Sequence, residues 1–173
     1  MFSPIQISKR LSAASGFLDL SMPVEAVAEL KPLLEEPQLQ TLRPLRRLHG
    51  EALIELRQFA EAREIYIGIL GERPEDVDAA IKKAWCEKRM GRLPAAIRTM
   101  ERAVRLHPRE AVLQYNLACY HALAVDKPRC LSRLGVAIRL DRSIAGMIDS
   151  ESDFDNFRQD ADFNSLIAMA TEK

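Results

Sequence analysis

The chain has 173 residues, of which 47% are hydrophobic and 29% are charged, while aromatic residues make up only 6%. This size and composition fit one domain with a continuous core and favour helices. Basic and acidic residues balance at 25 each, which excludes bulk attraction to nucleic acid or to an anionic membrane. No segment has the apolar length of a signal peptide core or a membrane span. We therefore expect a cytoplasmic protein that binds no nucleic acid and no membrane.

One repeating interval organises the sequence. The same interval separates Ala62 from Ala96, Pro74 from Pro108, and Ala96 from Cys130. A period of this length, about 34 residues, is typical of stacked structural repeats, in which each repeat contacts its neighbours. We expect one domain over residues 1–173, built from helix pairs at about 7–40, 43–76, 77–110 and 111–144, with a segment at 145–173 outside the register.

The first unit, residues 7–40, matches the pattern least well. Ala14 and Ala26 occupy its small positions, but Pro32 lies inside its predicted second helix. Proline in a helix interior lacks a hydrogen-bond donor and costs about 3 kcal/mol. We therefore expect a kink or an early helix end near Lys31.

The next three units each combine a small residue with a bulky one. Counted from the first residue of each repeat, the eighth position, in the first helix, is small, and the twenty-fourth position, in the second helix, is bulky. A small position lets a neighbouring backbone approach, and a large side chain fills the remaining space. These positions are predicted to be core: Gly50, Ala84 and Ala118 in the first helices, and Tyr66, Met100 and Leu134 in the second.

Most of the chain resembles tetratricopeptide repeats of the bacterial type, most clearly the third and fourth units. The resemblance lies in the segments VDAAIKKAWCEKRMGRLPAAIRTMERAVRLHP and AVLQYNLACYHALAVDKPRCLSRLGVAIRLD, including the run Tyr115 to Ala118 and the close Leu140-Asp141. It implies an all-α fold, a right-handed α-solenoid of about four helix pairs with C-terminal capping helices. In this family the concave face, formed by the first helices, binds a peptide or a helix of another protein.

The last segment, residues 145–173, contains seven acidic and two basic residues. Phe154, Phe157 and Phe163 provide apolar anchors, and the final repeat of an array needs its outer apolar face covered. We expect one or two short capping helices. An alternative is that this acidic segment lies along the basic repeats and occupies the groove. Its acids only loosely imitate a calcium-binding loop, because Phe154 stands where the sharp turn needs glycine.

Residues for catalysis or metal binding are missing from the pattern. The three histidines, His49, His107 and His121, occupy different places in the repeat, and no glycine-rich phosphate loop is present. Three cysteines are odd in number and unpatterned, which favours reduced thiols over disulfides. We expect no enzyme activity, no cofactor and no metal.

The family register places particular side chains on the concave face, and we expect the peptide-binding groove to include Arg47, Glu51, Ile81, Trp85, Lys88, Arg89 and Tyr115. Tryptophan, tyrosine and arginine are the residues that most often anchor interfaces. For Trp85, packing against neighbouring helices is an equally good interpretation. The third unit has nine basic and four acidic residues, which favours an acidic peptide with an aromatic or apolar anchor.

A groove that grips a C-terminal carboxylate does not fit, because Glu51 or Asp78 falls at a position where such domains have a basic or amide residue. The main hypothesis is a non-catalytic scaffold for protein–protein interaction. The alternatives are a small chaperone of secreted client proteins and a regulatory subunit of a larger assembly. The sequence leaves the partner and the oligomeric state open.

Overall fold

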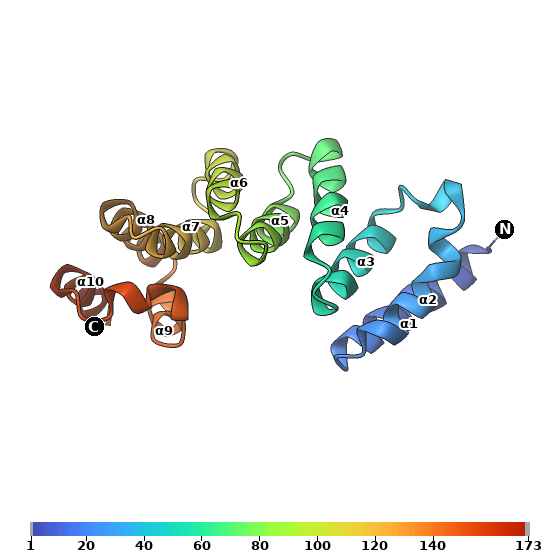
Figure 1. The fold of residues 1–173 in the computed structure, drawn as a ribbon, viewed down its shortest axis with the longest axis horizontal. Helices are drawn as coiled ribbons and strands as arrows, with labels where there is room; N and C mark the ends of the chain where they lie inside the picture. The colour runs from blue at the N-terminus through green and yellow to red at the C-terminus, as the bar shows by residue number, and fades with distance from the viewer. Residues whose placement is uncertain (1, 172–173) are drawn as a thin grey trace. The chain divides into compact units, whose positions relative to one another are not determined.

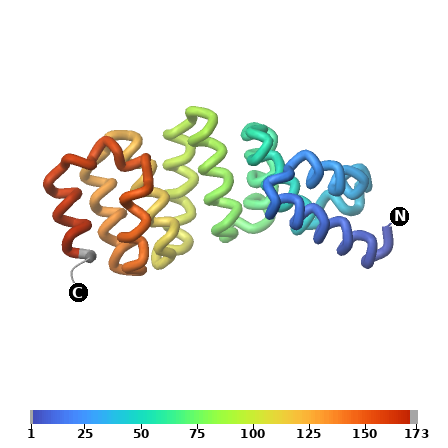
Figure 2. Tube along the Cα trace, turned by 90° about the horizontal axis from the view of Figure 1, so that it is seen from below, coloured from blue at the N-terminus to red at the C-terminus, as the bar shows by residue number. Residues whose placement is uncertain are grey.

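A computed structural model of the chain describes residues 2–171, and it consists of helices joined by short turns (Figure 1). No strand occurs among the described residues, and no helix there is both long and apolar enough to cross a bilayer. The chain divides into two compact units, Met1–Met90 and Gly91–Lys173. Within each unit, successive helices lie side by side and are joined at their ends (Figure 2).

The helices follow the predicted period. The first helices of the second, third and fourth repeats are α3 (Arg43–Glu55), α5 (Val77–Arg89) and α7 (Ala111–Leu123). The second helices are α4 (Phe59–Glu72), α6 (Leu93–Leu106) and α8 (Lys127–Leu140). In these three repeats each first helix has 13 residues and each second helix has 14, and both series recur at the interval seen in the sequence.

The turn inside each repeat has a fixed backbone conformation. Arg57, Gly91 and Val125 occupy the same place in successive repeats, and their φ angles are 61°, 73° and 57°. Each lies in the left-handed region that commonly ends a helix and that glycine adopts most easily. The repeat therefore requires a left-handed residue here, and only one of these three positions is occupied by glycine.

The small and bulky positions of the repeat are buried, as the register predicts. Ala84, Ala118, Met100 and Leu134 have no exposed surface. Gly50 lies very close to Tyr66, because a Cβ atom on Gly50 would be 2.9 Å from Cζ of that ring. The backbone of Gly50 therefore lies directly against the ring of Tyr66, which leaves no room for a larger residue at position 50.

The first repeat consists of α1 (Pro4–Asp19) and α2 (Pro23–Leu34), followed by a short 3-10 helix, η1 (Pro37–Leu39). The helix does not end at Lys31, because α2 continues through Pro32. It ends at Leu34 after 12 residues, two fewer than the second helices of the other repeats. Pro32 has no N–H to donate to the carbonyl four residues earlier, so α2 continues to Leu34 without that hydrogen bond.

The segment after the fourth repeat forms short helices, as expected for a cap. They are η2 (Arg142–Ile144), α9 (Ala145–Ile148), η3 (Ser152–Phe157) and α10 (Ala161–Thr171). Phe154, Phe157 and Phe163 are buried, and η3 packs on α7 while α10 packs on α8. The end of the predicted cap, residues 172 and 173, lies outside the described residues.

Candidate protein-binding surfaces

The first-helix face of the fourth repeat is covered by the chain's own tail. The rings of Tyr115 and Phe154 meet edge to face with centroids 5.9 Å apart, and the Asn156 side chain donates a hydrogen bond to the carbonyl of Ala122 over 3.3 Å. The thiol of Cys119 lies within 4.8 Å of the carboxylates of Glu151 and Asp153. Residues 151–156 therefore lie along the fifth, ninth and twelfth residues of α7 (Ala111–Leu123), which are Tyr115, Cys119 and Ala122.

The structure differs from the expectation for Tyr115. The sequence places it in an open groove, but only 5% of its surface is exposed, and burial raises the pKa of its hydroxyl. The reason is that Phe154 of the tail packs on the Tyr115 ring and is itself completely buried there. Tyr115 is therefore a contact of the tail in this structure.

In the compact unit Met1–Met90, Trp85 belongs to a cluster of aromatic and cationic side chains. Its ring meets Phe59 edge to face at 5.4 Å between centroids, and the Arg89 guanidinium lies 5.4 Å from the centroid of each ring. Trp85 is half-buried while Arg89 is exposed. Trp85 thus packs against the first turn of α4 and still leaves part of its surface open.

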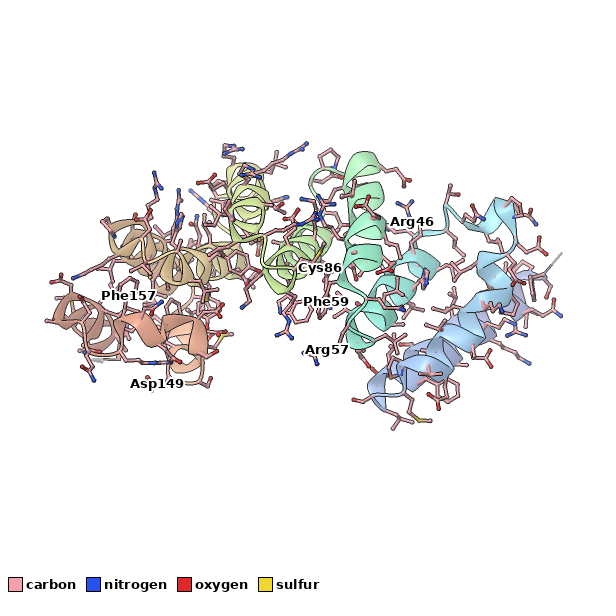
Figure 3. All side chains as sticks on the ribbon, viewed as in Figure 1. Arg46, Arg57, Phe59, Cys86, Asp149 and Phe157 are labelled. Atoms are coloured by element: carbon pink, nitrogen blue, oxygen red, sulfur yellow. The ribbon has the colours of Figure 1, made fainter. Side chains whose placement is uncertain are left out.

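Phe59, labelled in Figure 3, is a member of this cluster that sequence reasoning missed. The available signal was its place as the first residue of α4, immediately after the inner turn that contains Arg57. A large side chain at this place lies near the end of the following first helix. The groove register considers first helices only, so it could not identify a contributor from a second helix.

Two other predicted groove residues, Arg47 and Glu51, form ion pairs inside the compact unit Met1–Met90. Arg47 pairs with Asp76, at 2.5 Å between Nη2 and Oδ2, and also with Asp78. Glu51 lies 3.7 Å from the ammonium of Lys82. Arg47 therefore holds α3 to the start of α5, and its role in this structure is structural.

Ile81 and Lys88 are half-buried on α5, the helix that also carries Trp85 and Arg89. Of the predicted set, the structure brings Trp85 directly against Arg89. The helix α5 therefore carries one partly exposed aromatic side chain, Trp85, and the cations Lys82, Lys88 and Arg89. Of these cations, Lys82 is paired with Glu51.

Burial shifts the pKa values of the cysteines and histidines inside the repeats. The three cysteines are free and buried, as expected for reduced thiols, and burial raises the pKa of Cys86 to about 11 and that of Cys130 to about 12. Burial also lowers the pKa of His49 and His121. Thiols with such pKa values are protonated at neutral pH and are weak nucleophiles.

The acids of the tail are dispersed. Asp149, labelled in Figure 3, is exposed, and Asp160 lies 2.6 Å from the ammonium of Lys127, which also binds Asp162 at 2.6 Å. Hydrogen bonds to these two carboxylates raise the pKa of Lys127. The one grouping of potential metal ligands among residues 2–171 is Cys119 with Glu151 and Asp153, which the sequence did not predict.

Comparison with known proteins supports the assignment of helix-pair repeats. Residues 53–118 match a family model described as tetratricopeptide repeat, while no curated protein matches the chain. MamA from Desulfovibrio magneticus RS-1, from residue 41 to its end, has a similar structure with a TM-score of 0.68 and 18% identity, covering 97% of this chain and 98% of that chain.

Two further solved structures are similar. A double mutant named MamA RS-1 ArsTM has a TM-score of 0.69 and 18% identity, and covers 95% of this chain and 94% of that chain. TTC0263, a thermophilic TPR protein from Thermus thermophilus, has a TM-score of 0.64 and 17% identity, with coverage of 94% and 97%. The periodic helix pairs and these likenesses of fold show an all-α solenoid, and within it residues 53–118 match the tetratricopeptide repeat family.

Proposed function

We propose that the protein is a non-catalytic scaffold that holds a segment of another protein against the face formed by its first helices. The observation that carries this proposal is the tail on α7. Residues 151–156 contact the fifth, ninth and twelfth places of a first helix, with Phe154 completely buried. The chain's own acidic tail thus packs on this face of the fourth repeat through an aromatic residue, which supports the proposal.

The equivalent places in the third repeat are Ile81, Trp85 and Lys88, which are half-buried. An apolar or aromatic side chain of a partner would pack on Ile81 and on the open part of Trp85. Arg89 stacks on two rings through its face, and stacking leaves the in-plane N–H groups of a guanidinium available to a carboxylate. The chemistry of α5 therefore favours an acidic segment with an aromatic or apolar anchor.

The test is affinity capture from the native cell with the full chain, quantified against three variants. Trp85→Ala removes the anchor position, and the double variant Lys88→Glu/Arg89→Glu reverses the charge beside it. Arg73→Glu, at an exposed arginine in the turn after α4, is the matched control. Partners that bind this face are expected to be lost from the first two variants and kept by the control. Unchanged capture of every partner would refute the proposal.

The same contact supports a second role for the tail, as a cover of the fourth repeat. If the tail competes with a partner for α7, then Phe154→Ala should increase partner capture even though it lowers stability. A tail that only caps the array would give lower capture and lower stability together. Capture in a fixed stoichiometry would instead favour the regulatory-subunit alternative.

A further inference from the structure

The helix α6 carries three arginines in one exposed stripe. Arg98, Arg102 and Arg105 are separated by four and three residues, which places them on the same side of a helix. The opposite side of α6 is buried through Ala96, Met100, Ala103 and Val104. Figure 3 shows nitrogen-tipped side chains extending outward from α6. The stripe is thus a surface feature separate from the first-helix face discussed above.

None of these three arginines forms an ion pair with another described residue. Several arginines elsewhere in the chain do form ion pairs, for example Arg10, Arg46 and Arg63, each of which pairs with a glutamate. An exposed guanidinium gains little stability for the fold when no carboxylate meets it. Stability of the folded chain therefore does not explain this row of charge.

The repeat itself does not require arginine at these places. One period earlier, in α4, the equivalent residues are Glu64, Gly68 and Gly71, and one period later, in α8, they are Ser132, Val136 and Arg139. The stripe is a property of α6 alone. Leu106, which follows Arg105 and lies four residues after Arg102, is 47% exposed and adds an apolar side chain to the same surface.

We propose that this stripe, defined as Arg98, Arg102, Arg105 and Leu106, is a second docking surface that binds an acidic helix of a partner protein. A helix rises about 1.5 Å per residue, so the three arginines span about 10 Å. A partner helix with carboxylates at the same spacing presents its charges at the same pitch. Charge-assisted hydrogen bonds between guanidinium and carboxylate groups then form along the row, and an apolar side chain of the partner covers Leu106.

Extended polyanions fit this surface less well than a short acidic helix. The formal net charge of the chain is zero, and the exposed acids Asp149, Asp155 and Asp162 belong to the same unit as α6. They would repel a membrane or a nucleic acid that approached over a wide area. In addition, α6 contains no aromatic residue on which a base could stack.

The experiment measures binding of the full chain to a helical, alanine-rich probe peptide. The peptide carries three glutamates spaced by four and three residues, with a leucine beside the last, so that it mirrors the stripe. The comparison peptide has the same composition in scrambled order. Protein variants are the triple reversal Arg98→Glu/Arg102→Glu/Arg105→Glu and a control reversal of Arg57, Arg73 and Arg142, which are exposed and lie outside the stripe. Circular dichroism checks that both remain folded.

We expect the patterned peptide to bind the wild type at least about tenfold more tightly than it binds the triple reversal, with the control reversal near the wild type. Equal binding of the scrambled peptide, or equal losses in the two reversals, would overturn the proposal. Retention on vesicles with about 30% phosphatidylserine, or on duplex DNA, that the triple reversal abolishes while peptide binding stays absent would also overturn it.

Discussion

Gly50 is the residue at which the small-beside-large pattern of the repeat is most severe. A Cβ atom there would lie 2.9 Å from both Cζ and the hydroxyl oxygen of Tyr66. Tyr66 has no exposed surface, so its ring cannot move into solvent. We predict that Gly50→Ala lowers the free energy of unfolding by about 1 to 2 kcal/mol, since overpacking outweighs the gain in helix propensity.

Urea denaturation followed by circular dichroism measures this effect, and Gly16→Ala is its control. Gly16 is a helical glycine in α1, and a Cβ atom there would meet nothing within 4 Å beyond its own helix backbone. Alanine at this position should therefore raise stability by up to about 1 kcal/mol. Opposite signs for the two substitutions are the expected result. If Gly50→Ala were as stabilising as Gly16→Ala, the contact with Tyr66 would not limit the packing.

Val125 occupies a backbone conformation that suits it poorly. Its φ angle is 57°, and a β-branched residue in the left-handed region is strained by about 1 to 2 kcal/mol. It is also 66% exposed, so its side chain contributes little burial. We predict that Val125→Asn raises the free energy of unfolding by about 1 kcal/mol, because asparagine tolerates this conformation better.

The converse substitution tests the same cause. Gly91 has the equivalent conformation, with a φ of 73° and open space around a Cβ atom, so Gly91→Val should lower the denaturation midpoint by backbone strain alone. A loss of stability in Val125→Asn would instead indicate that the valine side chain makes packing interactions that outweigh its strain.

At the scale of single residues, the sequence predicted which positions are buried better than it predicted which side chains contact one another. The register identifies Gly50 and Tyr66 as facing core positions because a strict period fixes which residues are buried. It could not identify Phe59 as a neighbour of Trp85, or Phe154 as the cover of Tyr115. Those contacts join a second helix or the tail to a first helix, and no period relates the two.

Among the elements, α3 and α5 are joined through one carboxylate. Asp76 precedes α5 and accepts a hydrogen bond from the Ala79 N–H over 3.0 Å, while its other oxygen binds Arg47 of α3 at 2.5 Å. It therefore both caps a helix and fixes that helix to its neighbour. Burial acts to raise the pKa of Asp76, but these hydrogen bonds and the charge of Arg47 outweigh it, and the pKa is lowered.

A lowered pKa makes the contribution of Asp76 depend on pH in a defined direction. The stabilisation is fully present above the pKa of the unfolded chain, about 3.9, and is lost as the pH falls through the lower pKa of the folded chain. Asp76→Asn keeps a capping oxygen and removes the charge. We predict that this variant is less stable than the wild type by about 1 kcal/mol at pH 7 and that the difference shrinks at pH 3.

Urea titrations of both proteins at pH 7, 5 and 3 provide the measurement. A difference that stayed constant over this range would mean that the charge of Asp76 does not stabilise the fold. The ion pair was not predictable from the groove register, which assigned Arg47 to the peptide-binding face. The pairing follows from the helix start at Asp76, which the repeat spacing places opposite the first helix before it.

The helices themselves were predictable because small and bulky residues recur at a constant period, and prolines and Gly91 lie near several of the helix ends. The exception is α2, for which Pro32 predicted a kink or an early end near Lys31, whereas the helix continues to Leu34. In α2 the helix contains Pro32 and ends two residues later. Local rules of this kind give the cost of a residue in a helix, but the packing of Leu30 and Leu33, both fully buried, decides whether the helix continues.

At the scale of the whole molecule, a repeat array is stabilised by contacts between neighbours. The sequence predicted the need for a cap, since the period ends at residue 144 and aromatic residues follow. It did not determine which helix the cap would cover. In the structure the cap packs on both helices of the fourth repeat, with Phe154 lying 5.9 Å from Tyr115 of α7 and 5.4 Å from Phe163 of α10 between ring centroids.

Phe154→Ala should therefore loosen one end of the chain and leave the other intact. Removing a completely buried phenylalanine costs about 3 to 5 kcal/mol, and we expect hydrogen exchange to accelerate in α7, α8 and α10 while α1, α2 and α3 keep their protection. Met169→Ala, at a position that is 71% exposed in the same tail, should change neither. Equal acceleration in all helices would show that the chain opens as one cooperative unit. Local acceleration would mean that the fourth repeat alone can open without unfolding the rest, which is the property a tail needs if it is to give up its place on α7 to a partner.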